Sequence, residues 1–442
     1  MAGDPSSLRL VGAILLTAVG AMTLFFVRRN EKLEWNERLA AHFLCWAFII
    51  KGFGGISGNY AIQWFEDGNT EGGSPFWFYL AGTLTSDYVF EMLFMALAFV
   101  FPIPILRKIE HLKIAYGLII ALTTLRYVMF VLGIPLHTII DMYGLYYLVC
   151  GLIWCTIYVK FRLLDDDAAK ESSANIANVA GLLFIFVAGH HLLNWAGLVF
   201  RADYFLYIEM MGNLSGRAAD YWWQALSTFT IATGLFILGT EIYQATRGDT
   251  SPLLYISLAY FVVGLIGYTV LAGSNSSAVW WKTGGDSLQA TWITLTNSMH
   301  FTMIRPIIGV YIMLRYGLFD TTDEMKPKAK LMVIILIVIA TSALLELIQA
   351  ILPLNEMFTA VLLGVLVAFG IGWEEKSFDK LTNASKHMRE GLDVRWFPDF
   401  TISKHTFTMI DRSMAIMLVF VAALSLLVWQ TDVFYDWAMR QQ

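Results

Sequence analysis

Runs of about 20 apolar residues recur along the whole 442-residue chain, and each is long enough to cross a hydrocarbon core of about 30 Å as a helix. Only 15% of the residues are charged, against about 25% in a soluble domain. Because a backbone in lipid must satisfy its own hydrogen bonds, such runs form helices. The sequence therefore predicts an all-α, multi-pass integral bundle of about 12 transmembrane helices in the cell membrane, in contact with the lipid bilayer. The predicted spans are 8–27, 39–61, 76–101, 113–132, 138–161, 175–200, 219–244, 252–272, 288–316, 329–352, 355–373 and 412–430.

The basic residues orient these spans. Segments that follow the odd-numbered spans contain 22 of the 30 Lys and Arg residues, the segments on the other side contain 5, and the remaining 3 lie inside spans. Cytoplasmic loops collect such residues, so we expect both termini to lie outside the cytoplasm. Arg28, Arg29, Lys32 and Arg38 follow the first span and only Arg9 precedes it. This order favours a retained anchor over a cleaved signal peptide.

Three regions follow from this topology. Residues 1–373 form a helical membrane domain of about eleven spans, 374–411 a cytoplasmic segment, and 412–442 the last helix with an outer tail. The cytoplasmic segment has apolar residues at helical spacing among basic ones, which is typical of a helix on the inner membrane surface or of a connector packed on helix ends. No nucleotide-binding or kinase motif is present, so an enzyme is not favoured and no nucleic-acid partner is expected.

The stretch from Leu288 to Asp320 is long enough to span the membrane but contains unusually polar groups. At about 100° per residue, Asn297, His300 and Arg305 fall on one arc, which predicts a polar seam that faces other helices. The adjacent Pro306 removes one backbone hydrogen bond and is expected to kink the helix.

Two acids and two bases are predicted at membrane depth in the first four spans. Asp87 and Glu91 lie one helical turn apart in the third span, Lys51 lies in the second, and Arg126 in the fourth. Uncompensated charge is costly there, so we expect Lys51 or Arg126 to pair with Asp87 or Glu91. These groups are candidates for a ligand site or an ion pathway, and the alternative is a neutralised network that fixes helix register.

Glycines and a second pair of charges extend this pattern. The run Gly52, Gly54, Gly55 and Gly58 directly follows Lys51 and predicts either close helix packing or a broken helix beside the lysine. In the other half of the chain, Arg305 is expected to pair with Glu346 of the next span. Opposite charges in adjacent spans are the natural partners.

Histidines form a third group at membrane depth. His190, His191 and Asn194 share a polar face of the sixth span, and His300 lies in the ninth. If these three histidines converge, they could bind haem iron, since axial ligation uses histidines from two helices. The alternative is that they hydrogen-bond to neighbouring helices. The identity of any metal or cofactor stays open at this point.

A stretch near the end of the ninth span suggests a family likeness. The sequence Leu-Arg-Tyr-Gly-Leu-Phe-Asp at 314–320, followed by two spans and Glu-Glu-Lys-Ser-Phe-Asp-Lys-Leu at 374–381, resembles the multi-span sensor regions of histidine kinases. The resemblance covers about residues 310–381. No phosphoacceptor or ATP-binding domain follows, so it implies a sensing or partner-binding module without a kinase of its own and supplies no catalytic residue.

Three functions are therefore compatible with the sequence. The first is a non-enzymatic sensor or binding module with a small-molecule ligand on the outer half and a cytoplasmic protein partner at 374–411. The second is a proton- or ion-coupled secondary transporter that uses the intramembrane charges. The third is a haem-binding electron-transfer subunit.

Overall fold

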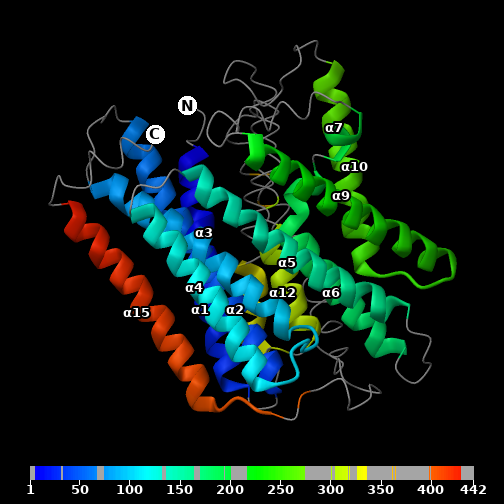
Figure 1. Ribbon diagram of the computed structural model, residues 1–442, viewed down its shortest axis with the longest axis horizontal. Coiled ribbons are helices and arrows are strands. Elements are labelled where there is room, and N and C mark those ends of the chain that lie inside the picture. Colours follow the sequence, from blue (N-terminus) through cyan, green and yellow to red (C-terminus); the bar gives the residue numbers. More distant parts are fainter. Residues whose placement is uncertain are drawn as a thin grey trace. The chain divides into compact units, whose positions relative to one another are not determined.

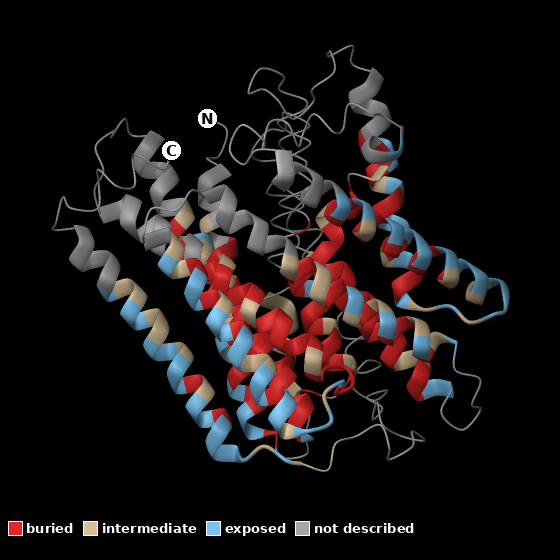
Figure 2. Cartoon of the chain, in the orientation of Figure 1, coloured by how far each residue is buried: buried red, intermediate tan, exposed pale blue. Residues whose placement is uncertain are grey.

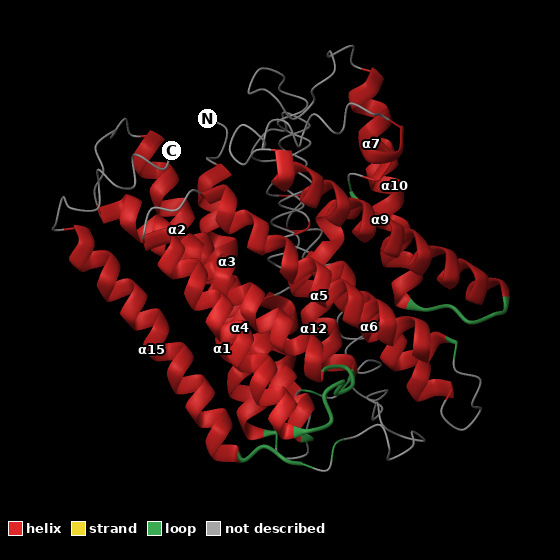
Figure 3. Ribbon diagram, viewed as in Figure 1, coloured by secondary structure: helices red, strands yellow, loops and turns green. Residues whose placement is uncertain are grey.

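The computed structural model of the chain is all-helical. It describes residues 5–30, 33–66, 74–131, 136–163, 170–193, 195–200, 217–273, 300, 304–316, 318, 326–335, 361, 364, 398 and 400–429, and none of these forms a strand (Figures 1 and 3). Seven of the described helices are long and apolar enough to cross a membrane. The predicted all-α class is thus confirmed, and the apolar helices are compatible with a membrane protein. The predicted spans 329–352 and 355–373 lie mostly outside the described residues.

The chain folds as two compact units, each with its own helices. Unit 1 comprises Met1–Tyr127, Thr302–His387 and Val394–Gln442, and unit 2 comprises Val128–Phe301 and Met388–Asp393. The described helices of unit 1 are α1 (Pro5–Arg29), α2 (Trp35–Glu66), α3 (Ser74–Val100), nearly all of α4 (Ile109–Val131), α12 (Arg305–Arg315) and α15 (Lys404–Trp429). Those of unit 2 are α5 (Leu136–Arg162), α6 (Lys170–Leu192), α7 (Trp195–Phe200), α9 (Arg217–Thr246) and α10 (Pro252–Gly273).

Two helices differ from the predicted spans in a way that matters for function. The predicted span 175–200 is divided, because α6 ends at Leu192 and the short α7 begins at Trp195. The Trp195 indole Nε1 donates to the carbonyl oxygen of Phe261 in α10 at 2.8 Å, which anchors the start of α7 on another helix. Helix α15 begins at Lys404, eight residues before the predicted span, and the Ser403 hydroxyl accepts a bond from the Thr406 N–H in its first turn.

Helix α2 packs on α1 and α3 through glycines. A Cβ at Gly52 would lie 2.7 Å from the Ala13 carbonyl oxygen and 2.8 Å from the Thr17 nitrogen, both backbone atoms of α1. The opposite contact is made at Gly54, whose missing side chain leaves room for Ser86 of α3. Small residues allow helices in lipid to approach this closely. The close-packing alternative is therefore correct, whereas the broken helix is not formed, since α2 is continuous from Trp35 to Glu66.

This packing gives a first testable expectation. Gly52→Ala should destabilise the protein by about 1–3 kcal/mol, because the added methyl meets backbone atoms that cannot rotate away. The control is Gly117→Ala in α4, where a Cβ meets nothing within 4 Å and the helix should gain slightly. Thermal unfolding in detergent compares the two variants. Equal stability of both would contradict the tight α1–α2 contact.

Large apolar side chains are exposed on several helices. Figure 2 shows α15 mostly in the exposed and intermediate colours, whereas α6 is almost entirely buried. Large apolar side chains exposed on long apolar helices are compatible with contact to a lipid bilayer. The exposed residues include Ile114, Leu118, Ile120 and Leu125 on α4, Leu235, Phe236 and Ile242 on α9, Leu258, Val262 and Ile266 on α10, and Ile416, Val419 and Phe420 on α15.

Candidate functional site

Unit 1 places an ion pair in the middle of two long apolar helices. The Lys51 Nζ lies 2.6 Å from the Asp87 Oδ1. Asp87 is 13 residues from the Val100 end of α3, about 20 Å along the axis, and Lys51 is at a similar depth in α2. The two side chains are nevertheless 28% and 44% exposed. Among the described residues, Lys51 is the single hydrogen-bond partner of Asp87, so this carboxylate retains accepting capacity toward its surroundings.

A second ion pair lies one helical turn away on α3 and is buried. Arg126 of α4 donates to Glu91, and the two side chains are only 7% and 2% exposed. The Arg126 guanidinium also lies 4.0 Å from the ring centroid of Tyr88. Each acid of the predicted layer is therefore paired with one base. The two pairs differ in access, since the Lys51–Asp87 pair is partly exposed near the middle of its helices and the Arg126–Glu91 pair is buried.

An aromatic ring connects the partly exposed pair to α12. Phe90 contacts two cations, with the Lys51 Nζ 4.7 Å and the Arg305 Cζ 5.2 Å from its ring centroid. Such cation–π contacts hold a charge in an apolar environment. The predicted partner of Arg305, Glu346, lies outside the described residues, so that pairing remains a prediction. Three basic side chains, Lys51, Arg126 and Arg305, thus line this part of α3.

The three histidines of unit 2 meet, as a haem site would require. The His190 ring centroid is 4.0 Å from that of His191 and 5.7 Å from that of His300. They also contact hydroxyl groups, and the closest is the Tyr260 Oη, 2.7 Å from the His300 Nδ1. A Cβ at Gly189 would lie 2.7 Å from the His300 Cε1, so this imidazole packs directly on the α6 backbone. No described group of three or more His, Cys, Asp or Glu side chains is arranged to hold a metal ion.

Of the predicted polar seam, the structure describes His300 and Arg305. His300 contacts Tyr260 in unit 2, whereas Arg305 contacts Phe90 in unit 1. Positions 300 and 304 have π-helical geometry, and the regular α-helix starts only at Arg305. Residues 301–303 lie outside the described part of the chain, so the shared face of His300 and Arg305 stays a prediction. Pro306 sits in the first turn of α12, where its missing N–H breaks no helical bond. Two predicted seam and face residues, Asn297 and Asn194, lie outside the residues whose side chains are described.

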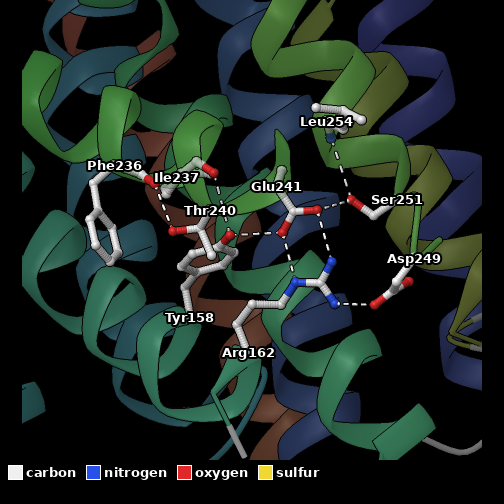
Figure 4. Close-up of polar contacts among 9 residues, drawn as sticks. All are labelled: Tyr158, Arg162, Phe236, Ile237, Thr240, Glu241, Asp249, Ser251 and Leu254. Carbon is white, nitrogen blue, oxygen red and sulfur yellow. Dashed lines mark hydrogen bonds and ion pairs between the residues drawn. The ribbon is translucent and has the colours of Figure 1, made fainter. Parts of the chain in front are cut away.

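A cluster that the sequence did not reveal joins three helices of unit 2 (Figure 4). The buried Glu241 of α9 accepts four hydrogen bonds: from Arg162 Nε and Nη2 at 2.9 and 3.1 Å, Tyr158 Oη at 2.7 Å and Ser251 Oγ at 2.6 Å. Arg162 also donates to Asp249 at 2.7 Å. Both oxygens of Glu241 are saturated by fixed donors. We call this cluster the clamp, because its hydrogen bonds hold α5, α9 and the start of α10 together. Glu241 thus accepts four hydrogen bonds, whereas Asp87 accepts one among the described residues.

A second cluster missed by the sequence lies at helix ends in unit 1. The buried Asp411 of α15 accepts bonds from Arg28 Nε at 2.7 Å, His42 Nδ1 at 2.9 Å and Trp46 Nε1 at 2.8 Å. The three partners come from α1 and α2, and each lies more than 360 positions before Asp411 of α15 in the sequence. The position of Asp411, an acid next to basic residues at the start of a predicted span, indicates that it forms an ion pair. The spacing of residues in the sequence does not identify its partner.

Comparisons with known proteins supply no relative. No protein-family model, no curated protein and no solved structure matches the chain. The assignment of a function therefore rests on the geometry described above.

Proposed function

We propose that the protein is a proton- or ion-coupled secondary transporter and that the Lys51–Asp87 pair is its exchange site. One observation carries this proposal: both charged side chains are partly exposed although they lie near the middle of apolar helices. A charge that faces hydrocarbon is very costly, so these exposed atoms must meet water or a polar solute. Water at that depth requires a cavity open to one side of the membrane.

The chemistry of the pair suggests how coupling works. When Asp87 takes up a proton it becomes neutral, and the Lys51 ammonium loses its counter-charge. The ammonium then attracts a small anion, and release of that anion restores the ion pair with loss of the proton. Arg126 keeps its own partner Glu91 throughout, because that pair is buried. The proposed substrate class is therefore a small organic or inorganic anion that moves together with a proton.

The proposal is tested with the full chain in liposomes that contain a pH-sensitive dye. Lactate, succinate, glutamate and sulfate are added in turn outside, at a constant inward proton gradient. Acidification of the lumen that depends on one of these anions and on the protein supports the proposal. If correctly inserted protein gives the same proton flux with and without every anion, transport by this pair is ruled out for these solutes and the binding function below takes precedence.

A ligand-sensing or partner-binding module is the second candidate. It is favoured by the glycine contacts that lock α1, α2 and α3 together, since a binding site needs less internal motion than alternating access does. The resemblance of residues 310–381 to histidine-kinase sensor regions points in the same direction. On this proposal a cytoplasmic protein binds the 374–411 segment. Such a partner should co-purify with the wild type and be lost when Lys376, Lys380, Lys386 and Arg389 are replaced by Gln.

Haem-dependent electron transfer is the third candidate, carried by the meeting of His190, His191 and His300. The contact between the Tyr260 Oη and the His300 Nδ1, at 2.7 Å, favours the alternative that these histidines hydrogen-bond to neighbouring helices. An optical spectrum of the purified protein decides the matter. A Soret band that disappears in His300→Ala would support haem ligation, and a colourless protein would exclude it.

The proposed topology has twelve crossings in the cell membrane with both termini outside. It is supported by the Asp411 contacts, which bring together the end of α1, the start of α2 and the start of α15, three ends that the charge distribution assigns to the cytoplasm. Fusion of an enzymatic reporter to each terminus tests it. Activity of a periplasmic or extracellular reporter at both ends is expected, and a cytoplasmic terminus would refute the topology.

A further inference from the structure

A pocket of about 380 Å³ opens beside Asp411 in unit 1. It lies where α1 ends, α2 begins and α15 begins, and its volume is in the range of small-ligand sites. The charge distribution predicts that these helix ends face the cytoplasm. The pocket is lined by Arg28, Arg38, His42, Lys404, Phe407, Thr408, Asp411 and Arg412.

The lining is strongly cationic. Four basic side chains, those of Arg28, Arg38, Lys404 and Arg412, face a single acid. Asp411 does not neutralise them all, because its Oδ2 accepts from Arg28 and its Oδ1 from His42 and Trp46. Among the lining residues, the four basic side chains therefore outnumber the one acidic side chain. A pocket of this charge at the membrane surface attracts phosphate-bearing ligands.

Fixed groups shape the pocket in addition to its charge. Arg38 is 8% exposed, donates to the Asn30 carbonyl oxygen at 2.8 Å, and lies over the Phe407 ring with its Cζ 5.8 Å from the centroid. His42 stacks on the same ring at 5.2 Å. Basic residues that merely follow the charge bias of cytoplasmic loops would be dispersed and solvated. Here they converge from three helices around one buried arginine and one aromatic wall.

We propose that this pocket binds a phosphate group. The ligand is a phosphate ester, supplied either by the headgroup of an anionic phospholipid of the inner leaflet or by a soluble phosphorylated molecule. Arg28, Lys404 and Arg412 contact the phosphate oxygens, and Arg38 forms the inner wall. Arginine and lysine at helix ends are well suited to this chemistry, because their N–H donors match phosphate oxygens. The site is separate from the Lys51–Asp87 pair and does not depend on the transport proposal.

The test uses the delipidated full chain and the double variant Lys404→Gln, Arg412→Gln. Both side chains are exposed, so the fold should survive their replacement. The matched control is Lys108→Gln, Lys113→Gln, which removes two exposed basic residues elsewhere in unit 1. Native mass spectrometry measures binding of phosphatidylglycerol and of phosphatidylcholine, and a thermal shift measures binding of inorganic phosphate and of glycerol 3-phosphate against chloride.

The double variant should bind the phosphate ligand about 10-fold or more weakly, whereas the control should bind like the wild type. Selective loss of phosphatidylglycerol, with phosphatidylcholine unchanged, supports the site and identifies a lipid as the source. Loss of the shift with inorganic phosphate or glycerol 3-phosphate, without a lipid preference, supports the site with a soluble ligand. If the double variant binds all four probes as the wild type does, the pocket is not a phosphate site.

Discussion

Arg162→Met should lower the free energy of unfolding of unit 2 by about 3–5 kcal/mol, because it leaves the Glu241 carboxylate buried without its cation. The side chains of both residues are at least 94% buried, and Arg162 supplies two of the four bonds to Glu241. Tyr158 and Ser251 can still donate, but neither carries charge. The clamp between α5, α9 and the start of α10 therefore depends on the guanidinium.

Thermal unfolding in detergent measures the loss of stability in Arg162→Met relative to a control variant at a nearby arginine. Arg247→Met is the matched control, because Arg247 is exposed near the end of α9 and its recorded contact is with the Tyr243 ring, 5.0 Å from the centroid. The control should change stability by no more than about 0.5 kcal/mol. Equal stability of Arg162→Met and Arg247→Met would show that the Glu241 cluster does not hold these helices together.

On the transport proposal, Asp87→Asn should reduce anion-dependent proton flux to the level of empty liposomes, which is the largest expected effect on activity. The amide has the shape of the carboxyl group but cannot exchange a proton, so the cycle of pairing with Lys51 stops. Stability should change by only about 1 kcal/mol or less, because a partly exposed ion pair contributes little. Loss of flux with an unchanged fold separates a functional carboxylate from a structural one.

Two further variants define the role of this carboxylate. Glu110→Gln removes an exposed acid at the start of α4 and should leave the flux unchanged. Asp87→Glu keeps the titratable group and should retain part of the flux. Full activity of Asp87→Asn in a well-folded protein would eliminate this residue from any proton path, and the sensor proposal would then be preferred.

The helices and the charge pairs of unit 1 follow from local sequence. Apolar runs specify α1 to α4, because each helix in lipid must satisfy its backbone hydrogen bonds within its own segment. The spacing of Asp87 and Glu91 places them on one face of α3, and charge balance then limits their partners to few candidates. The sequence does not predict how far each ion pair is exposed. The partly exposed Lys51–Asp87 pair and the buried Arg126–Glu91 pair look alike in the sequence, because their exposure depends on how neighbouring helices are placed.

The contacts of Asp411 and Glu241 could not be predicted for a different reason. Both acids lie near helix ends, where a charged residue is ordinarily solvated. Their partners come from distant segments, as with His42 and Asp411, so no spacing rule connects them. The predicted seam of Asn297, His300 and Arg305 stays a prediction, because Asn297 and residues 301–303 lie outside the described part of the chain.

The most direct measurement is the water accessibility of position 87. Cys45, Cys150 and Cys155 are the natural cysteines, and replacing all three by Ala gives a background for Asp87→Cys. The control is Ile120→Cys on α4, 56% exposed on an apolar helix and about 16 Å from its Ile109 end. A charged, membrane-impermeant methanethiosulfonate is applied to the protein in liposomes. We predict rapid modification at position 87 and none at 120. Failure of position 87 to react from either side of the membrane would contradict the proposal that a polar solute reaches Asp87.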